Sequence, residues 1–386
     1  MRDRDLKRYN ASLMLSVVAT ALWTGTLAVV LSDIIDSYGL QGAQEGLMSS
    51  MISIGALAAL LATALFQGKY KKAEVIIWCG LLACGALLAQ GAPLPFTLFL
   101  LACFIMGLGH GAVDTCQSAF LADLHRGDTA RHMGALHGIF GIGGVATPLL
   151  LQALLRRFPW RAIYIIVGLA CLALIAQFAA VTYSMRAKVS VSSRMEPRLT
   201  LADVKKLLGN RCYISLLLTI FFGAAGQSGI IVWTIRYVSV SLSSPAIAAL
   251  CLSLFWVTST ISRFGSPRLP LRPGLILAAG AFISAAAWAA ALLINQPPAL
   301  LAACCVAGLA SGSCIPLSLS EGASLNPEST GFSTSVLMIS KTLAQILCPI
   351  AMAFVMSLYG MRAGMYVTAL LFVANGIFAS LIVCGK

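Results

Sequence analysis

The sequence has very little charge. Asp, Glu, Lys and Arg make up 10% of its residues and hydrophobic residues make up 59%, whereas an average soluble domain is about 25% charged. Such a chain cannot cover a large water-exposed surface, so we exclude a sizeable soluble domain. A membrane-spanning helix needs roughly 20 apolar residues, and twelve such segments account for nearly the whole sequence.

Motifs of soluble enzymes and of metal sites are also missing. The sequence has no phosphate-binding GxxxxGK[ST] loop, and the glycines at 141–144 lie in a predicted helix rather than after a strand, which excludes built-in ATP hydrolysis and dinucleotide binding. The twelve cysteines include no CxxC pair and no Cys/His ligand spacing, so we expect small buried hydrophobic residues. We predict a protein that is not an enzyme and has no resident metal or other cofactor.

The net charge of +13 is explained by orientation in a membrane. With a cytoplasmic N-terminus, the inner segments carry 20 basic residues and the outer ends carry 5, and Lys341 inside a helix completes the 26. This excess places both termini in the cytoplasm. We therefore expect a lipid bilayer as the partner of this charge, and no nucleic acid.

The apolar runs predict an all-α membrane protein with twelve transmembrane helices in two pseudo-symmetric six-helix bundles. The predicted domains are an N-terminal bundle over 1–184, a cytoplasmic linker over 185–210 with a short amphipathic helix, and a C-terminal bundle over 211–386. The predicted helices cover 10–35, 43–67, 73–91, 94–122, 131–156, 160–184, 211–237, 245–264, 273–294, 297–320, 330–356 and 361–383.

An internal repeat appears at an offset of 201 residues. GLGHG at 107–111 matches GLASG at 308–312, and Pro148 matches Pro349. Six helices, an even number, separate the copies, so both copies cross the membrane in the same direction. This is a parallel repeat, the design of transporters built from two six-helix halves.

One helix face carries the most unusual polar groups. His110, Asp114 and Gln117 follow one another at i, i+4 and i+7, so they share a face. Asp114 lies roughly 12 Å from the cytoplasmic end of its helix and His137, on the next helix, roughly 9 Å. An ionisable group in a bilayer is costly unless it is paired, protonated or facing a cavity. We predict that Asp114 switches its protonation state; the alternative is a structural hydrogen bond between the two helices.

A second charged group lies deeper. Lys341 is predicted roughly 16 Å into its helix, followed one turn later by Gln345. The interpretations are an anchor for an anionic substrate, a counter-ion to Asp114, or a lysine held by a carbonyl or by Ser340.

The remaining candidates are weaker. We expect Trp23, Thr26, His110, Gln117, Gln227 and Trp233 to bind substrate together with Lys341 and Gln345, although Trp233 also suits an interfacial aromatic belt. Asp123 and Arg131, at the predicted inner mouth, are candidates for a gate, and a solvated loop is the alternative.

The twelve helices, the basic central loop, the parallel halves and the WRAIY turn at 160–164 resemble the major facilitator superfamily. Within it, the segment around Asp114 and His137 is similar to the fucose–galactose–hexuronate symporters and the sodium–glucose branch. The matching residues are Gly111, Asp114, Thr115, Leu136, His137, Phe140, Gly141, Gly143 and Pro148. The sequence departs at Ser118, where that pattern has Asn.

This resemblance implies that Asp114 is the cation-coupling carboxylate and that His137 is a substrate or gating contact, with Thr115 and Ser118 as further ligands if the ion is sodium. We predict a proton- or sodium-coupled symporter of a small polar solute such as a sugar, working as a monomer in a bacterial cytoplasmic membrane. The alternatives are a drug, metabolite or organic-anion exporter of the same fold and a non-transporting membrane receptor. Exporters of this superfamily commonly carry an Arg near position 103, where this chain has Cys103.

Overall fold

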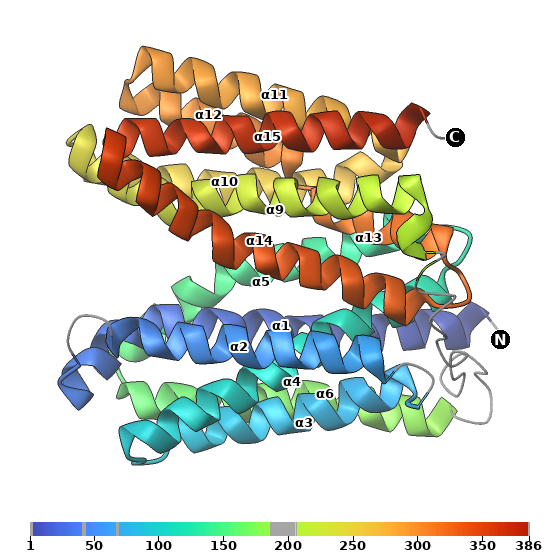
Figure 1. The fold of residues 1–386 in the computed structure, drawn as a ribbon. Helices are drawn as coiled ribbons and strands as arrows, with labels where there is room; N and C mark the ends of the chain where they lie inside the picture. Colours follow the sequence, from blue (N-terminus) through green and yellow to red (C-terminus); the bar gives the residue numbers. More distant parts are fainter. Residues whose placement is uncertain (1–2, 41–43, 67–68, 186–204, 206, 385–386) are drawn as a thin grey trace. The chain divides into compact units, whose positions relative to one another are not determined.

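The computed structural model describes residues 3–40, 44–66, 69–185, 205 and 207–384. Within these residues the chain is helical and contains no strand (Figure 1). Twelve spans among them are long and apolar enough to cross a membrane. The predicted fold class, an all-α membrane protein with twelve transmembrane helices, is confirmed.

The helices agree closely with the predicted ranges. The first six are α1 (Asp3–Tyr38), α2 (Gln44–Leu65), α3 (Lys72–Gln90), α4 (Phe96–Leu124), α5 (Thr129–Leu155) and α6 (Trp160–Met185). They are followed by α9 (Arg211–Arg236) with a π-helical turn, η1 (Tyr237–Ser241), α10 (Pro245–Gly265) with a 3-10 turn, η2 (Ser266–Arg268), and α11 (Pro273–Ile294). The last are α12 (Pro297–Ser311), α13 (Cys314–Leu325), α14 (Thr330–Tyr359) and α15 (Met361–Cys384).

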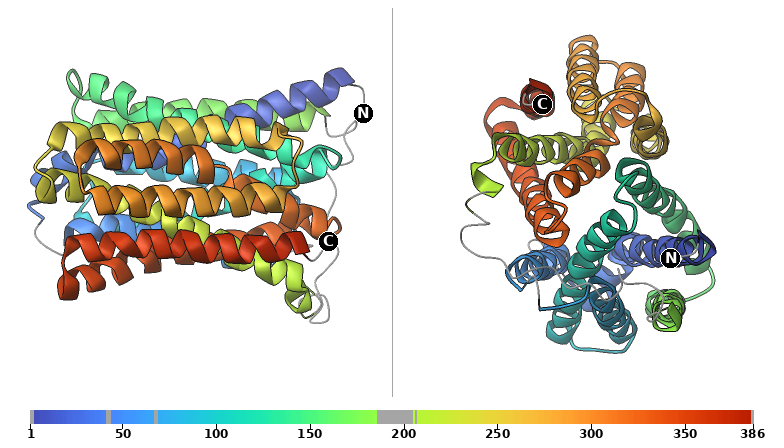
Figure 2. Two further views of the ribbon diagram at one scale, coloured as in Figure 1. Left: turned by 90° about the horizontal axis from the view of Figure 1, so that it is seen from above. Right: turned by 90° about the vertical axis from the view of Figure 1, so that its right-hand side faces the viewer.

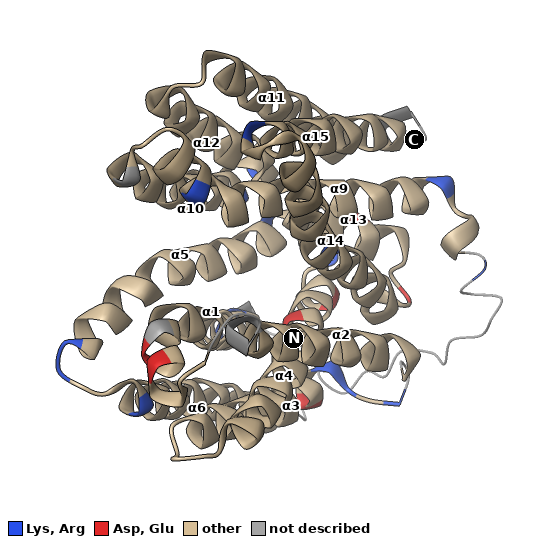
Figure 3. Cartoon of the chain, turned by 60° about the vertical axis from the view of Figure 1, so that its left-hand side comes forward, with Lys and Arg blue, Asp and Glu red and all other residues tan. Residues whose placement is uncertain are grey.

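Local sequence explains these ends. Three helices begin with proline, whose missing N–H would have no partner in the first turn. The side chain of Asn210 caps α9 by accepting hydrogen bonds from the backbone N–H groups of Cys212 and Tyr213. Many of the charged residues lie at helix ends and in loops (Figure 3).

The single helix predicted over 297–320 is wrong in one respect. The chain breaks at Gly312 and Ser313, and α13 then continues to Leu325. The cause is Pro316, because a proline lacks the N–H that would bond to the carbonyl four residues earlier and its ring clashes with that carbonyl. That carbonyl belongs to Gly312. The break brings Glu321, which the prediction left in a loop, into a helix.

Contacts divide the chain into two units. Unit 1 comprises Met1–Arg126, Ile142–Arg198 and Pro327–Ser335, and unit 2 comprises Gly127–Gly141, Leu199–Asn326 and Val336–Lys386. In unit 1, α4 packs on α2 and α3, and α6 packs on α1 and α3; in unit 2, α15 packs on α9 and α11, and α12 packs on α10 and α11 (Figure 2). The first part of α5 therefore belongs to unit 2, and the first part of α14 belongs to unit 1.

Two of the predictions on organisation are not tested. The predicted domain boundaries stay a prediction. Most of the predicted linker at 185–210 and its amphipathic helix lie outside the described residues.

The repeated glycines perform the same task in each unit. A side chain at Gly107 or Gly111 would collide with the backbone of α2, at Ile52 and Ala56. A side chain at Gly308 or Gly312 would collide with the backbone of α10, at Phe255 and Ser259. The GLGHG and GLASG segments therefore let two helix backbones approach closely, as their spacing predicts.

Candidate functional site

A buried polar seam joins α1 to α4 in unit 1. Trp23 Nε1 donates to His110 Nδ1 at 3.1 Å, with the two rings edge to face and their centroids 6.2 Å apart. Two turns further along α4, Gln117 Nε2 donates to Ser16 Oγ at 2.9 Å and Thr20 Oγ1 donates to Gln117 Oε1 at 3.3 Å. Two of the predicted substrate residues, His110 and Gln117, are thus held by side chains of α1.

The bond from Trp23 orients the His110 ring. An indole N–H can only donate, so Nδ1 of His110 is the acceptor. The position of this ring therefore depends on the contact between α1 and α4.

Asp114 lies on the same face of α4 as His110 and Gln117 but is less enclosed. Gln117 and Ser118 are fully buried, whereas Asp114 is half-buried. The Asp114 side chain is therefore more exposed than that of Gln117 and lies at the edge of the seam.

Two hydroxyls beside Asp114 have no hydrogen-bond partner among the described residues. They are Thr115 Oγ1 and Ser118 Oγ, in side chains that are 1% and 0% exposed. A buried hydroxyl without a partner is unfavourable, so each of these atoms is available to a water molecule or a bound ion. Ser118 lies one turn from Asp114, on the same helix face.

The backbone at His137 is held by an arginine that the sequence analysis missed. Arg263 of α10 is 5% exposed, and its Nη1 donates to the His137 carbonyl at 3.1 Å while Nε donates to the Gly312 carbonyl at 3.2 Å. Its guanidinium also lies 5.6 Å from the ring centre of Trp256. Gly312 follows the last turn of α12, where the helix dipole is negative. This clamp, within unit 2, fixes the first part of α5 to the break between α12 and α13.

His137 and Asp114 belong to different units. His137 is 7% exposed. Its predicted position opposite Asp114 stays a prediction.

The unit 2 candidates differ in their accessibility. Lys341 of α14 is half-buried, and Gln345 one turn later is exposed. Gln227 is buried and donates to the Ser311 carbonyl at 2.7 Å, a bond between α9 and α12. Trp233 is half-buried, and no described residue bonds to its Nε1.

Thr26, the last substrate candidate, lies in unit 1. It is fully buried and donates to the Leu22 carbonyl of its own helix at 2.8 Å. The substrate roles of Thr26, Gln227, Trp233, Lys341 and Gln345 stay predictions.

Asp123 belongs to a buried ionic network in unit 1. Lys72 Nζ lies 2.6 Å from Asp123 Oδ2, and Thr330 Oγ1 donates to Asp123 Oδ1 at 2.9 Å. Lys72 Nζ also donates to Thr330 Oγ1 at 2.6 Å. We call Lys72, Asp123 and Thr330 the buried trio. It fixes the start of α14 to α3 and α4. Nothing in the sequence distinguishes Lys72 from its neighbours in the basic loop.

The other predicted gate residue has different surroundings. Arg131 is paired with Asp128 at 3.9 Å, and the two side chains are 58% and 51% exposed. Such an exposed pair contributes little, which agrees with the alternative of a solvated loop.

A second missed residue is Glu321. It is 8% exposed and lies within α13. The sequence analysis ended the helix at 320 and so placed this carboxylate outside the span.

Comparison with known protein families finds a match over most of the chain. A family model described as Major Facilitator Superfamily matches residues 13–339. A search of curated protein sequences finds no significant match.

Solved structures give the same fold. The chain is similar to the E. coli fucose:proton symporter FucP, with a TM-score of 0.78, 18% identity, and 97% of this chain and 98% of that chain covered. A structure of FucP in the outward conformation has the same TM-score and identity, with 97% and 99% covered. The human organic anion transporter MFSD10 (TETRAN) has a TM-score of 0.74 and 15% identity, with 98% and 100% covered.

Proposed function

Because the chain belongs to the major facilitator superfamily and is a membrane transporter, we propose that it is a cation-coupled symporter of a small polar solute, with Asp114 as the coupling carboxylate. The observation that carries this proposal is a half-buried carboxylate next to two buried hydroxyls that have no partner among the described residues. Similarity in fold to a fucose:proton symporter supports it.

The residues around Asp114 fit either coupling ion. A proton would neutralise the carboxylate and remove the cost of a charge in a bilayer. A sodium ion would find a carboxylate and two hydroxyls, which are the oxygen ligands that hard cations prefer. In both cases the ion leaves when the site opens to the side where the ion is dilute.

We assign the solute contact to His110 and Asp114, which are both half-buried. Trp23 is fully buried and donates to His110, so its role is to orient that ring. A change in the Trp23–His110 bond would then change both the solute contact and the α1–α4 seam.

Two locks would control the change of access. The buried trio holds the start of α14 in unit 1, and Arg263 holds the start of α5 in unit 2. Both helices pass from one unit to the other, so releasing either lock frees a crossing helix. We place both locks, like both termini, on the cytoplasmic side.

Organic-anion transport is the second candidate. It is favoured by Lys341, a half-buried cation in the middle of α14 with the exposed Gln345 one turn away. A lysine at this depth suits an anionic carboxylate or phosphate group.

The test measures solute uptake into proteoliposomes in the presence and absence of an imposed pH or sodium gradient. Asp114→Asn is expected to abolish gradient-driven uptake while exchange of solute across the membrane persists. The matched control is Asp33→Asn, an exposed carboxylate in α1, which should behave like the wild type. Coupled uptake at the wild-type rate in Asp114→Asn would remove the proposed role.

The same assay separates the two candidates. If Lys341 anchors an anion, Lys341→Gln weakens uptake of anionic solutes and spares neutral sugars, whereas the exposed Lys69→Gln changes neither. Equal effects of the two lysine changes would exclude the anchor.

A further inference from the structure

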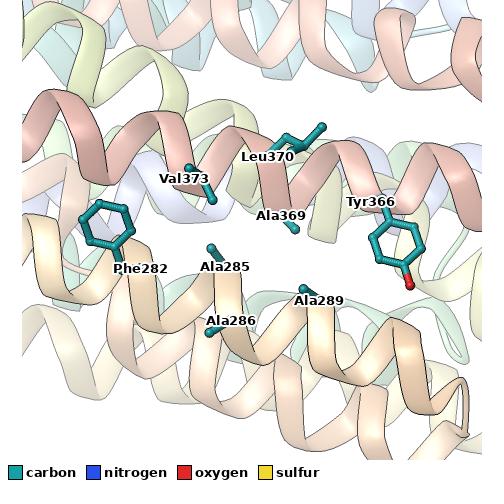
Figure 4. Close-up of a pocket in the computed structure, with 8 residues that line it drawn as sticks. All are labelled: Phe282, Ala285, Ala286, Ala289, Tyr366, Ala369, Leu370 and Val373. Carbon is teal, nitrogen blue, oxygen red and sulfur yellow. The ribbon is translucent and has the colours of Figure 1, made fainter.

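An apolar groove runs between α11 and α15 in unit 2 (Figure 4). Its volume is about 420 Å³, within the range of roughly 300–1,000 Å³ that is typical of small-molecule sites. Ala285 and Ala369 form the buried floor, and Phe282 and Leu370, which are 42% and 67% exposed, form the rim. The groove therefore opens toward the outside of the unit.

Only one polar group lines the groove, the hydroxyl of Tyr366, which lies at the end near Ala289 (Figure 4). α11 and α15 are both candidate membrane spans, so the open side faces hydrocarbon. An occupant must then be apolar along most of its length and polar at the Tyr366 end.

That end carries a positive charge. Arg362 lies one turn before Tyr366, and its Nη2 donates to the Leu292 carbonyl at 2.6 Å and to the Leu293 carbonyl at 3.3 Å. Its Nε donates to Leu292 as well, at 3.1 Å. Arg362 is exposed, and Nη1 makes no hydrogen bond to the described residues. The guanidinium is thus bound to the last turn of α11, about one turn beyond Ala289, and keeps one nitrogen for a ligand.

Among the described residues, no carboxylate forms a salt bridge with Arg362. A second arginine, Arg236, lies near the same end of the groove. It is the last residue of α9, and the hydroxyl of the next residue, Tyr237, donates to Asn295 Oδ1, just beyond α11, at 2.6 Å. Between 207 and 326 and between 336 and 384, the one described carboxylate is Glu321. Glu321 lies 24 residues after the start of α12, which corresponds to roughly 36 Å along the helix axis at 1.5 Å per residue. The Tyr366 end is therefore suited to an anion.

We propose that this groove binds an anionic phospholipid, with an acyl chain on the alanine floor and the phosphate against Arg362 and the Tyr366 hydroxyl. A phospholipid is the bilayer component that joins an apolar chain to a phosphate, and guanidinium groups bind phosphate well. A zwitterionic lipid such as phosphatidylcholine would bring its own cation close to Arg362, and a second copy of this chain would fill the groove without supplying a phosphate. The proposal does not depend on the solute or ion that is transported.

The test is native mass spectrometry of the purified full chain in micelles that contain phosphatidylglycerol and phosphatidylcholine in competition. The wild type is expected to retain phosphatidylglycerol preferentially. Arg362→Gln should reduce that preference by about a factor of five, the value of one basic residue near an anionic lipid. Arg362→Lys keeps the charge and should keep the preference, which separates lipid binding from a role in folding.

The groove itself is tested by filling it. Ala286→Leu and Ala289→Leu place methyl groups inside it and should reduce retention of both lipids. Ala290→Leu is the control, since Ala290 is exposed on the same helix and does not line the groove. Equal retention of the two lipids by the wild type would overturn the proposal. So would unchanged retention in the filled variants, or a lipid-independent dimer that Ala289→Leu dissociates.

Discussion

Replacing Asp123 by Asn is expected to destabilise unit 1 strongly. Asn keeps an acceptor for Thr330 but removes the charge opposite Lys72, whose Nζ lies 2.6 Å from Asp123 Oδ2. The side chains of Lys72 and Asp123 are 5% and 9% exposed. Water therefore cannot replace the lost carboxylate, and the buried ammonium group of Lys72 loses the negative charge 2.6 Å away.

The size of the effect follows from this geometry. Two unit charges at 2.6 Å attract by about 6 kcal/mol at an effective dielectric constant of about 20, and several kcal/mol of this offsets the lost hydration of the ions. Removing one partner of a buried pair lowers the free energy of unfolding by about 3–5 kcal/mol. The double variant Lys72→Met/Asp123→Leu buries no charge and should recover most of the loss.

Denaturant unfolding of the purified protein in detergent measures these free energies, and hydrogen exchange over Thr330–Ser335 reports whether the start of α14 is released. The matched control is Asp128→Asn, which removes an exposed pair with Arg131 and should cost about 0–1 kcal/mol. The reasoning is refuted if Asp123→Asn costs no more than Asp128→Asn, or if the double variant is no more stable than the single one.

Three further predictions concern helix contacts. Arg263→Gln removes charge-assisted bonds to two carbonyls and should lower the free energy of unfolding by about 1.5–3 kcal/mol per lost bond. It should also speed hydrogen exchange in the first part of α5, and unchanged exchange there would contradict the clamp. Gly111→Leu should prevent correct packing of α4 on α2 and lower the yield of folded protein, while Gly85→Leu, with no atom of a neighbouring helix within 4 Å of the added Cβ, should fold normally. Trp23→Phe removes the donor to His110 Nδ1, should lower the free energy of unfolding by about 1 kcal/mol, and should speed hydrogen exchange where α1 contacts α4; unchanged stability and exchange would contradict the orienting bond.

Much of the fold could be predicted because its determinants are local. Hydrophobic runs, prolines at helix starts and the cap at Asn210 act within a few residues, and ten of the predicted ranges needed no change beyond a few residues at either end. The two larger differences are the earlier start of α1 at Asp3 and the break at Gly312. The break also had a local cause, Pro316, whose effect the sequence analysis overlooked.

The candidate site was only partly predictable. The polar face of α4 followed from helical spacing, and the structure places His110 and Gln117 against α1. The sequence could not indicate which hydroxyls near Asp114 lack partners, since this depends on what neighbouring helices offer. Arg263 lies at the end of the predicted helix 245–264, and its role could not be predicted because its acceptors, at His137 and Gly312, lie 126 and 49 positions away.

The sequence by itself determined that this chain is a bundle of membrane-spanning helices with a parallel repeat, because apolar length and glycine spacing are properties of each segment. Only the tertiary structure decided which charges are buried. Lys71 and Lys72 are neighbours in one basic loop, yet Lys71 is 26% exposed and Lys72 is 5% exposed. The difference arises because Asp123 and Thr330, distant along the chain, surround only one of the two ammonium groups.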